Sequence, residues 1–278
     1  MTLHLLKPQA RREATQLHVS YSQLVSYMLC PMKYAHNYVW ATPPENRPLS
    51  MLFGRAIHKA VEEYYLCLQE TGKALPLEEF KQDFEKLFSK EIESSDVRVS
   101  MKKDESLEGA KAQGAELLEL FHREIRPQKI VAVELPFSVS VPDIVNGGDL
   151  PFQLVGYFDL VESDNDAYLI GELKTSAQKY SSLKLEYDLQ PTAYSYAMSR
   201  MKVSTTEHSC LLRYDVLVKT KTPTFEQYFV SRTEDDHHRF IHLINLVLMG
   251  IEQRLFYRNQ GWQCTDCQFK NACLGKGR

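Results

Sequence analysis

Apolar residues in the first 126 positions recur mostly at the three- and four-residue spacing of amphipathic helices. Ser20, followed three residues later by Gln23, forms a capping-box pattern that predicts a helix start. Pro31 disfavours a continuous helix, so this first helix should break or bend near it. Helical spacing is predicted for residues 20–30, 51–69 and 76–126. The N-terminal region is therefore expected to be helical.

After Pro127 the pattern changes to the alternation of apolar and polar residues that is typical of strands. Strands are predicted for residues 129–141, 152–162, 168–176, 209–220 and 225–233. A helical pattern over 186–200 interrupts them, and a long helix over 234–256 follows the last strand. This order of helices and strands predicts an α/β or α+β fold built around one sheet.

The strand over 168–176 carries two opposite charges on one face. Ile170, Glu172 and Lys174 alternate onto the same side of the strand. A buried charge is costly unless it is paired or holds a metal. Glu172 and Lys174 are therefore expected either to form a structural ion pair or to take part in chemistry, and the strand alone leaves both alternatives open.

A polar stretch over 163–167 predicts a turn between this strand and the preceding one. Asp159 and Glu172 lie equally far from the centre of that turn, so an antiparallel hairpin would bring their carboxylates together. Opposed like charges cost roughly 0.2–1 kcal/mol even when exposed, and a divalent cation such as Mg²⁺ or Mn²⁺ would remove that cost. Lys174 would then point at the same pocket, where it could orient or deprotonate a water or stabilise charge on a phosphate.

Six cysteines are present, and three of them form a compact Cys264-x₂-Cys267-x₅-Cys273 set near the C-terminus. In a reducing compartment such clustering favours a metal site over disulfides. A fourth thiolate must come from elsewhere, and Cys30 is the candidate. Four thiolates suit either Zn²⁺ or an iron–sulfur cluster, and the spacing does not choose between them.

The net charge of −3 argues against a uniformly basic surface but permits a local positive groove for nucleic acid. No run of about 18 apolar residues is present, so no membrane span is predicted. The N-terminal sequence places its apolar residues before its basic ones, the reverse of a secretory signal. We therefore expect a cytoplasmic protein with a flexible N-terminal arm over residues 1–19.

The carboxylate pattern resembles that of the PD-(D/E)XK nuclease superfamily, with Asp159 in LVGYFDLVE and Glu172 and Lys174 in IGELKTS. More narrowly, the chain resembles the RecB-like exonucleases that contain an iron–sulfur cluster, which include AddB-type recombination nucleases and nucleases of CRISPR adaptation. The similarity extends over residues 20–273, nearly the whole chain.

Four further segments carry this resemblance in order. They are SYSQLVSYMLCPMKY, FGRAIHKAVEEYY, VELPFSV and LQPTAYSYAM, which are similar to the family's N-terminal cysteine helix, histidine motif, acidic strand and Q-x-x-x-Y motif. One departure is Gln268 in DCQFKNAC, where many members have Pro. Gln268 is not among the predicted ligands, so the departure leaves the expected sites unchanged.

The resemblance implies a restriction-endonuclease-like core, a central mixed sheet flanked by helices, within a single nuclease domain over residues 20–273. Residues 76–126 would form a helical insertion in that domain. The cluster segment would consist of 264–273 together with Cys30, and residues 274–278 would be a tail.

The resemblance also implies a role for each matched residue. The ligands of Mg²⁺ or Mn²⁺ would be His58, Asp159, Glu172 and the backbone carbonyl of Leu173. Lys174 would be catalytic together with Asp159 and Glu172. Gln190 and Tyr194 are four residues apart and share a helix face, and with Glu134 they would support the site or contact DNA. A [4Fe–4S] cluster, in preference to Zn²⁺, would be held by Cys30, Cys264, Cys267 and Cys273.

The function expected from these features is that of a metal-dependent exonuclease that hydrolyses phosphodiester bonds at the ends of single-stranded DNA. Its partners would be DNA and proteins of repair, recombination or CRISPR adaptation. The alternative is a DNA-binding or assembly subunit with a vestigial nuclease site and a structural metal cluster. A zinc-ribbon interaction protein is a third hypothesis, but it explains the cysteines and not the carboxylates.

Overall fold

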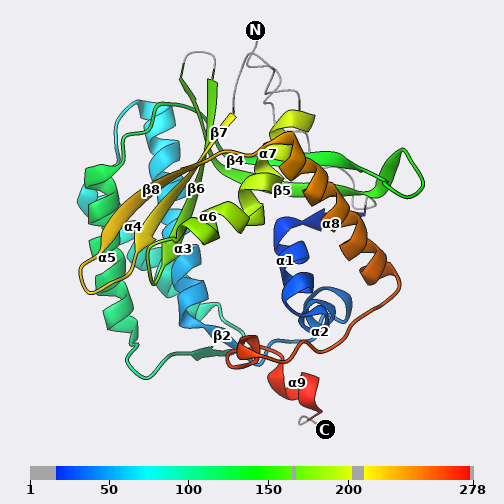
Figure 1. Ribbon diagram of the computed structural model, residues 1–278. Helices are drawn as coiled ribbons and strands as arrows, with labels where there is room; N and C mark the ends of the chain where they lie inside the picture. The colour runs from blue at the N-terminus through cyan, green and yellow to red at the C-terminus, as the bar shows by residue number, and fades with distance from the viewer. Residues whose placement is uncertain (1–16, 165–166, 202–209, 276–278) are drawn as a thin grey trace.

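A mixed six-stranded sheet forms the centre of the protein, with helices on both of its faces (Figure 1). The structure is a computed structural model, and it describes residues 17–164, 167–201 and 210–275. The strand order is β1-β5-β6-β7-β8, and β4 also pairs with β5. The strands are β1 (His18–Ser20), β4 (Lys129–Pro142), β5 (Asp149–Asp164), β6 (Ala167–Ser176), β7 (Cys210–Val218) and β8 (Thr224–Val230). The predicted α/β fold with a central mixed sheet is confirmed.

Helices precede, interrupt and follow the strands in the predicted order. They are α1 (Tyr21–Leu29), α2 (Pro31–Tyr34), α3 (Leu49–Thr71), α4 (Leu77–Glu93), α5 (Leu107–Glu124), α6 (Ser182–Tyr187), α7 (Leu189–Arg200), α8 (Glu234–Glu252) and α9 (Lys270–Leu274). A π-helical turn (Ala35–Val39), a 3₁₀ turn (Trp262–Cys264) and a small parallel pair of β2 (Asn46–Pro48) and β3 (Arg98–Ser100) complete the described elements. Among the described helices, none combines the length and apolar character that a membrane crossing requires.

The first helix begins where its capping pattern predicts. The Ser20 hydroxyl accepts a hydrogen bond from the Gln23 backbone N–H, and the Gln23 side chain accepts one from the Ser20 N–H. The helix ends before Pro31, which starts α2. The local rule therefore located both ends of α1.

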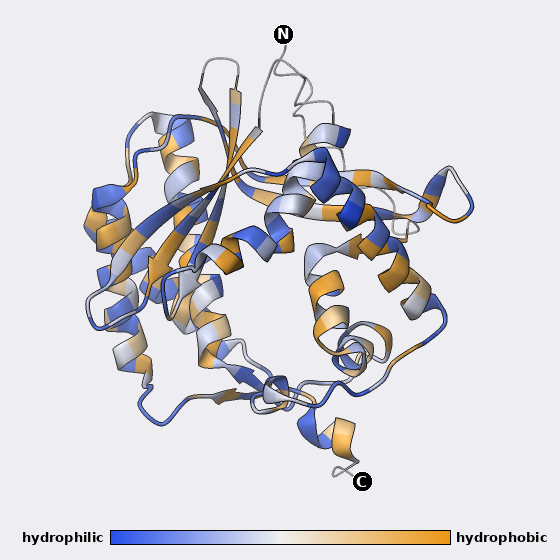
Figure 2. Ribbon diagram, viewed as in Figure 1, coloured by the Kyte–Doolittle hydropathy of each residue, from blue (hydrophilic) through white to orange (hydrophobic). Residues whose placement is uncertain are grey.

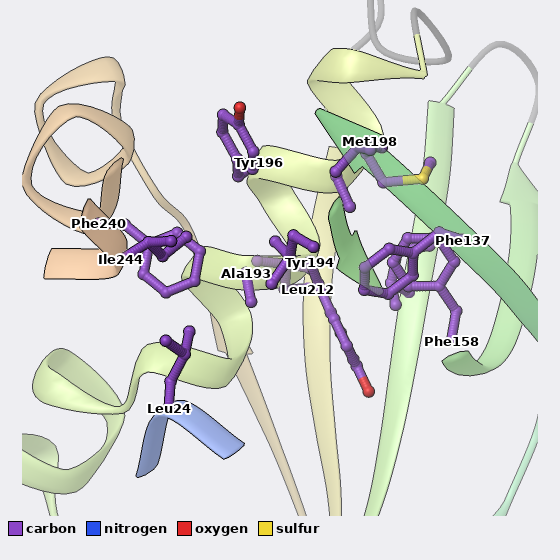
Figure 3. Close-up of a cluster of buried hydrophobic side chains, with 14 of the residues drawn as sticks. Leu24, Phe137, Phe158, Ala193, Tyr194, Tyr196, Met198, Leu212, Phe240 and Ile244 are labelled. Atoms are coloured by element: carbon purple, nitrogen blue, oxygen red, sulfur yellow. The ribbon is translucent and has the colours of Figure 1, made fainter. Parts of the chain in front are cut away.

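Two hydrophobic clusters cover the two faces of the sheet. The first packs α1, α7 and α8 against one face, and Figure 3 shows part of it around Tyr194 and Phe158. The second packs α3, α4 and α5 against the other face. Figure 2 shows apolar and polar residues interspersed along these three helices, as an amphipathic packing role requires.

The predicted insertion over 76–126 is an integral layer of the second cluster. Phe80, Phe84 and Phe88 project from α4 at a four-residue spacing, and all three are fully buried. The Phe84 and Phe88 rings pack against Phe53 of α3, which is the helix that carries His58. The packing of this segment therefore fixes the position of α3.

The predicted N-terminal arm over 1–19 is too long. His18–Ser20 forms β1, which pairs in parallel with β5, and Val19 is only 1% exposed. Three residues are too few for an alternating strand pattern to be recognised in the sequence. The burial of Val19 against the sheet stabilises the strand although its neighbours in the sequence are polar. The rest of the arm, residues 1–16, lies outside the described residues. Of the predicted tail, Leu274 belongs to α9 and 276–278 lie outside the described residues.

Candidate active site

The β5–β6 hairpin brings Asp159 and Glu172 to the point where the two strands separate. Its register pairs Leu160 with Gly171, which confirms the predicted alignment and makes Asp159 and Glu172 the next two opposed positions. At that point Asp159 Oδ2 accepts a hydrogen bond of 3.0 Å from the Leu173 backbone N–H. The Asp159 side chain thus takes the place of a backbone partner. We call this region the strand fork.

Glu172 is buried at the fork, and side chains of β6 and α7 hold both of its oxygens. Oε1 accepts hydrogen bonds from Lys174 Nζ and from Gln190 Nε2, the latter at 2.7 Å. Oε2 accepts one of 2.8 Å from the Tyr194 hydroxyl, which extends beyond the apolar cluster in Figure 3. Asp188 caps the N-terminus of α7 and accepts from the Gln190 N–H, so the helix presents both partners to the carboxylate.

His58 reaches the fork from α3, on the face of the sheet opposite α7. Its Nδ1 atom lies 3.6 Å from Asp159 Oδ2. Burial lowers the pKa of His58, the charge of Glu172 partly opposes this, and Lys174 lowers the pKa further. The imidazole is therefore neutral at pH 7 and offers a lone pair to a metal ion.

The fork holds more negative than positive charge. Burial raises the pKa of Asp159 well above its usual range, and the charge of Glu172 raises it further. Burial lowers the pKa of Lys174, but the charges of Glu172 and Asp159 outweigh this and raise it overall. Two carboxylates therefore share one ammonium in a desolvated site, an arrangement that an added cation stabilises.

A small pocket of about 10 Å³ lies between α3 and the fork, enough for one water-sized occupant. Its polar lining comes from α3, β4, β5 and β7. These residues are His58, Glu62, Glu134, Asp159 and Asp215, with Leu173 beside them. Of the metal ligands predicted from the sequence, His58, Asp159 and Leu173 line this pocket, whereas Glu172 lies against α7. The pocket also contains Glu62 and Asp215, which were not predicted from the sequence.

Glu134 occupies an unusual backbone conformation next to Asp159. In the β4–β5 register, Val133 pairs with Leu160 and Leu135 pairs with Phe158. Glu134 therefore lies opposite Asp159, but these two residues do not form a backbone pair. Its φ of 48° is left-handed, a conformation that costs a non-glycine residue about 1–3 kcal/mol and concentrates at functional sites. Burial raises the pKa of Glu134 to about 7, and the charges of Glu62 and Glu172 contribute.

The two missed residues follow from register and helix spacing. Glu62 lies four residues after His58 and so projects from the same face of α3. Asp215 is paired with Leu173 across β6 and β7, and two hydrogen bonds of 2.8 Å from Arg213 hold its carboxylate. An Arg-x-Asp sequence inside an apolar strand was the available signal for this buried pair.

The four predicted cysteine ligands line one cavity of about 250 Å³. Cys30 follows the last residue of α1, and the other three lie in the short C-terminal segment. Burial raises the pKa of Cys273, and the neighbouring thiols of Cys30 and Cys267 raise it further. We call this space the cysteine cavity. Lys33, His36 and Arg258 also line it.

Within the described ranges, no three His, Cys, Asp or Glu side chains stand in an arrangement that could hold a single metal ion. At the fork, both Glu172 oxygens are taken by Lys174, Gln190 and Tyr194. At the cysteine cavity, the thiols surround a space and do not meet at one point. The metal ligands predicted from the sequence therefore remain predictions.

Comparison with known proteins identifies the family of this chain. A model of the PD-(D/E)XK nuclease superfamily matches residues 18–274. Among curated proteins, none matches. The fold is similar to that of a putative exonuclease from Eubacterium rectale, with a TM-score of 0.55 and 12% identity, over 94% of this chain and 91% of that one. SSO0001 aligns over 92% of this chain and 95% of its own at 14% identity, with a TM-score of 0.37. The chain belongs to the PD-(D/E)XK nuclease superfamily.

Proposed function

We propose that this protein is a divalent-cation-dependent deoxyribonuclease that degrades single-stranded DNA from its ends. The observation that carries the proposal is the strand fork, where Asp159 lies beside His58 of a separate helix and the adjacent Glu172 is paired with Lys174. Membership of the PD-(D/E)XK superfamily supports the reaction class. The resemblance to RecB-like exonucleases supports the preference for ends and for single strands.

The types of donor atom at the fork suit a hard divalent cation. Asp159, Glu172 and the Leu173 carbonyl would provide oxygen donors, and neutral His58 would provide one nitrogen, a set suited to Mg²⁺ and, through the imidazole, to Mn²⁺. The excess of carboxylate charge favours such an ion. Its chemistry would be to polarise the phosphodiester and to activate a water molecule.

The protein side chains prepare the site in two ways. Lys174 stays protonated at neutral pH because the neighbouring carboxylates raise its pKa, so it stabilises charge on the phosphate and does not act as a base. Gln190 and Tyr194 fix the Glu172 carboxylate through separate oxygens. They are positioning residues, because they contact Glu172 and not the reacting atoms.

The direct test is hydrolysis of end-labelled single-stranded DNA with Mn²⁺ or Mg²⁺. Lys174→Ala should lower the rate roughly 10²–10⁴-fold. Lys179→Ala, which removes an exposed lysine paired with Glu226 just beyond the same strand, is the matched control and should retain activity. Equal rates for wild type and Lys174→Ala would discredit the site and favour a vestigial one. A closed circular strand should resist degradation if the enzyme requires ends.

We infer further that the cysteine cavity holds a [4Fe–4S] cluster. A single Zn²⁺ ion needs every sulfur about 2.3 Å from one point, whereas the four thiols surround a space of about 250 Å³. Lys33 and Arg258 line the same space and offset the charge of thiolates. The arrangement thus favours a cluster ligated by four cysteines.

Anaerobic purification followed by absorption spectroscopy and metal analysis tests the cluster. We expect a brown protein with about four irons per chain. Cys264→Ala should lose the colour, while Cys67→Ala, on α3 and away from the cavity lining, should keep it. A colourless wild-type protein that contains zinc would refute the cluster.

A further inference from the structure

Two segments without any carboxylate pack against each other beside the cysteine cavity. Residues 17–44 and 253–265 contain no Asp or Glu, although the chain has 36 acidic residues. The Met32 backbone N–H donates to the Tyr257 carbonyl at 3.1 Å, and Figure 1 shows the chain that leaves α8 passing beside α2. Tertiary packing therefore brings together two segments that carry no acidic side chain of their own, in a protein whose net charge is −3.

Large aromatic side chains remain exposed in these two segments. Tyr38 is 41% exposed, Trp40 49%, Tyr257 62% and Trp262 81%. The Trp40 ring packs edge-on against Phe256, with the ring centroids 5.9 Å apart, and Tyr38 packs against Tyr34, which also contacts Phe256. We call Tyr38, Trp40, Tyr257 and Trp262 the aromatic surface. Exposed apolar groups gathered in this way mark an interaction site more often than a solvated surface.

Positive charges accompany these rings. Arg254 and Arg258 flank Tyr257 in the sequence, and Lys33 lies on α2. Lys33 and Arg258 also line the cysteine cavity, next to Gly261, which precedes Trp262. Cations interleaved with exposed aromatic rings, in segments that carry no carboxylates of their own, suit a negatively charged polymer whose units have flat apolar faces.

The same segments lead back to the strand fork. The Tyr21 hydroxyl at the start of α1 donates to Asp188, the cap of α7, at 2.9 Å. Helix α1 has nine residues, about 13 Å, and Cys30 follows it. Helix α1 thus connects the residues that hold Glu172 to α2, whose Met32 contacts the backbone of Tyr257.

We propose that the aromatic surface binds single-stranded DNA by stacking of its bases and guides the strand that the fork hydrolyses. This inference rests on the proposed nuclease function and names a second contact of its substrate. A duplex keeps its base faces stacked internally, so it cannot use these rings in the same way. A protein partner would be expected to balance the local positive charge with its own carboxylates.

Intrinsic fluorescence offers a direct test, because both tryptophans of the chain, Trp40 and Trp262, belong to the aromatic surface. The full chain with Lys174→Ala, which prevents hydrolysis, is titrated with oligothymidylate. Saturable quenching is expected. An abasic oligomer of equal length and charge should quench little at the same concentration. No quenching by oligothymidylate, or equal quenching by the abasic strand, would overturn the inference.

Substitutions then locate the contact. Tyr257→Ala and Trp40→Ala should each weaken binding of oligothymidylate roughly tenfold, whereas Trp40→Phe should retain most of it. Tyr187→Ala, which removes a 70% exposed tyrosine on α6, is the matched control. Tyr257→Ala is expected to fold normally, because Tyr257 contacts α2 through its backbone carbonyl, which the substitution keeps. Unchanged binding in both alanine variants would refute the surface.

The two proposals fail in different ways. Normal Lys174-dependent hydrolysis without quenching would remove only the aromatic contact. Quenching without hydrolysis by the wild-type protein would retain the contact and remove the nuclease. Self-association that Trp40→Ala disperses, without binding of oligothymidylate, would assign the surface to a second copy of the chain and overturn the inference.

Discussion

The strand fork and the cysteine cavity are built in opposite ways. At the fork, Asp159, Glu172 and His58 project from two strands and a long helix, and protein partners already hold each side chain. At the cavity, three of the cysteines come from a segment of turns, one 3₁₀ turn and the five-residue helix α9. The fold alone positions the first site, whereas the second joins the region of α1 and α2 to a C-terminal segment that has little regular secondary structure.

This difference indicates where each site derives its order. The fork is preorganised by the sheet, and its crowded carboxylates oppose folding while they favour a cation. The cavity gains order when its cysteines ligate a common group, because ligation then adds to the free energy of folding. Disturbing the fork should therefore change activity more than stability, and disturbing the cavity should do the reverse.

The largest effect is expected for Asp159→Asn, which should lower DNA hydrolysis about 10²–10⁴-fold while raising the thermal midpoint in EDTA. The pKa of Asp159 is raised well above its usual range by burial and by Glu172. The folded state therefore binds the Asp159 proton more tightly than the unfolded state, so its contribution to stability falls as pH rises above the ordinary range of Asp. The uncharged side-chain amide of the Asp159→Asn variant removes the cost of burying a charged carboxylate at this position.

Activity and thermal unfolding measured across pH check this prediction. Asp149→Asn, at the exposed start of the same strand, is the matched control and should change neither quantity. A lower thermal midpoint for Asp159→Asn would contradict the charge imbalance at the fork.

The second prediction concerns the cavity. Cys264→Ala should lower the free energy of unfolding by roughly 3 kcal/mol, as loss of a cross-link between distant segments does, and so lower the thermal midpoint by roughly 6 °C or more. Limited proteolysis should cut first in the C-terminal segment. Cys67→Ala is the control, and an equal loss of stability there would show that the cavity has no special role.

The third prediction concerns the layer that supports α3. A Cβ at Gly114 would lie 2.1 Å from Phe84 Cζ, and such overpacking costs about 1–3 kcal/mol. The gain in helix propensity is at most about 1 kcal/mol, so Gly114→Ala should destabilise the protein. Ala112→Gly, on the exposed side of α5, isolates the propensity effect in denaturant titrations. A net gain in stability from Gly114→Ala would mean that Phe84 can move aside.

The smallest effect is expected from His237 of α8, which packs against both α7 and α1. Burial lowers the pKa of His237, and its Nε2 lies 2.9 Å from the Ser195 hydroxyl. Below the ordinary pKa of histidine the unfolded state takes up a proton that the folded state resists, so stability is lost as pH falls. His237→Gln should flatten this acid decline in thermal midpoint. If the thermal midpoint of His237→Gln falls at acid pH as much as that of the wild type, other groups cause the loss of stability.

The sequence determined those features that depend on neighbours along the chain. The Ser20–Gln23 capping box, the hairpin register that opposes Asp159 and Glu172, and the helix face shared by Gln190 and Tyr194 all follow from spacing. Each is governed by the period of a strand or a helix, which is local and does not need the rest of the fold.

Only the tertiary structure decided which distant groups meet. It placed Asp215 and Glu62 in the pocket of His58, made the segment over 76–126 part of the core, and paired β1 with β5. It also brought two segments more than 200 residues apart together around the cysteine cavity. Such contacts arise from the packing of whole faces against one sheet, and no short-range pattern encodes which faces will be neighbours.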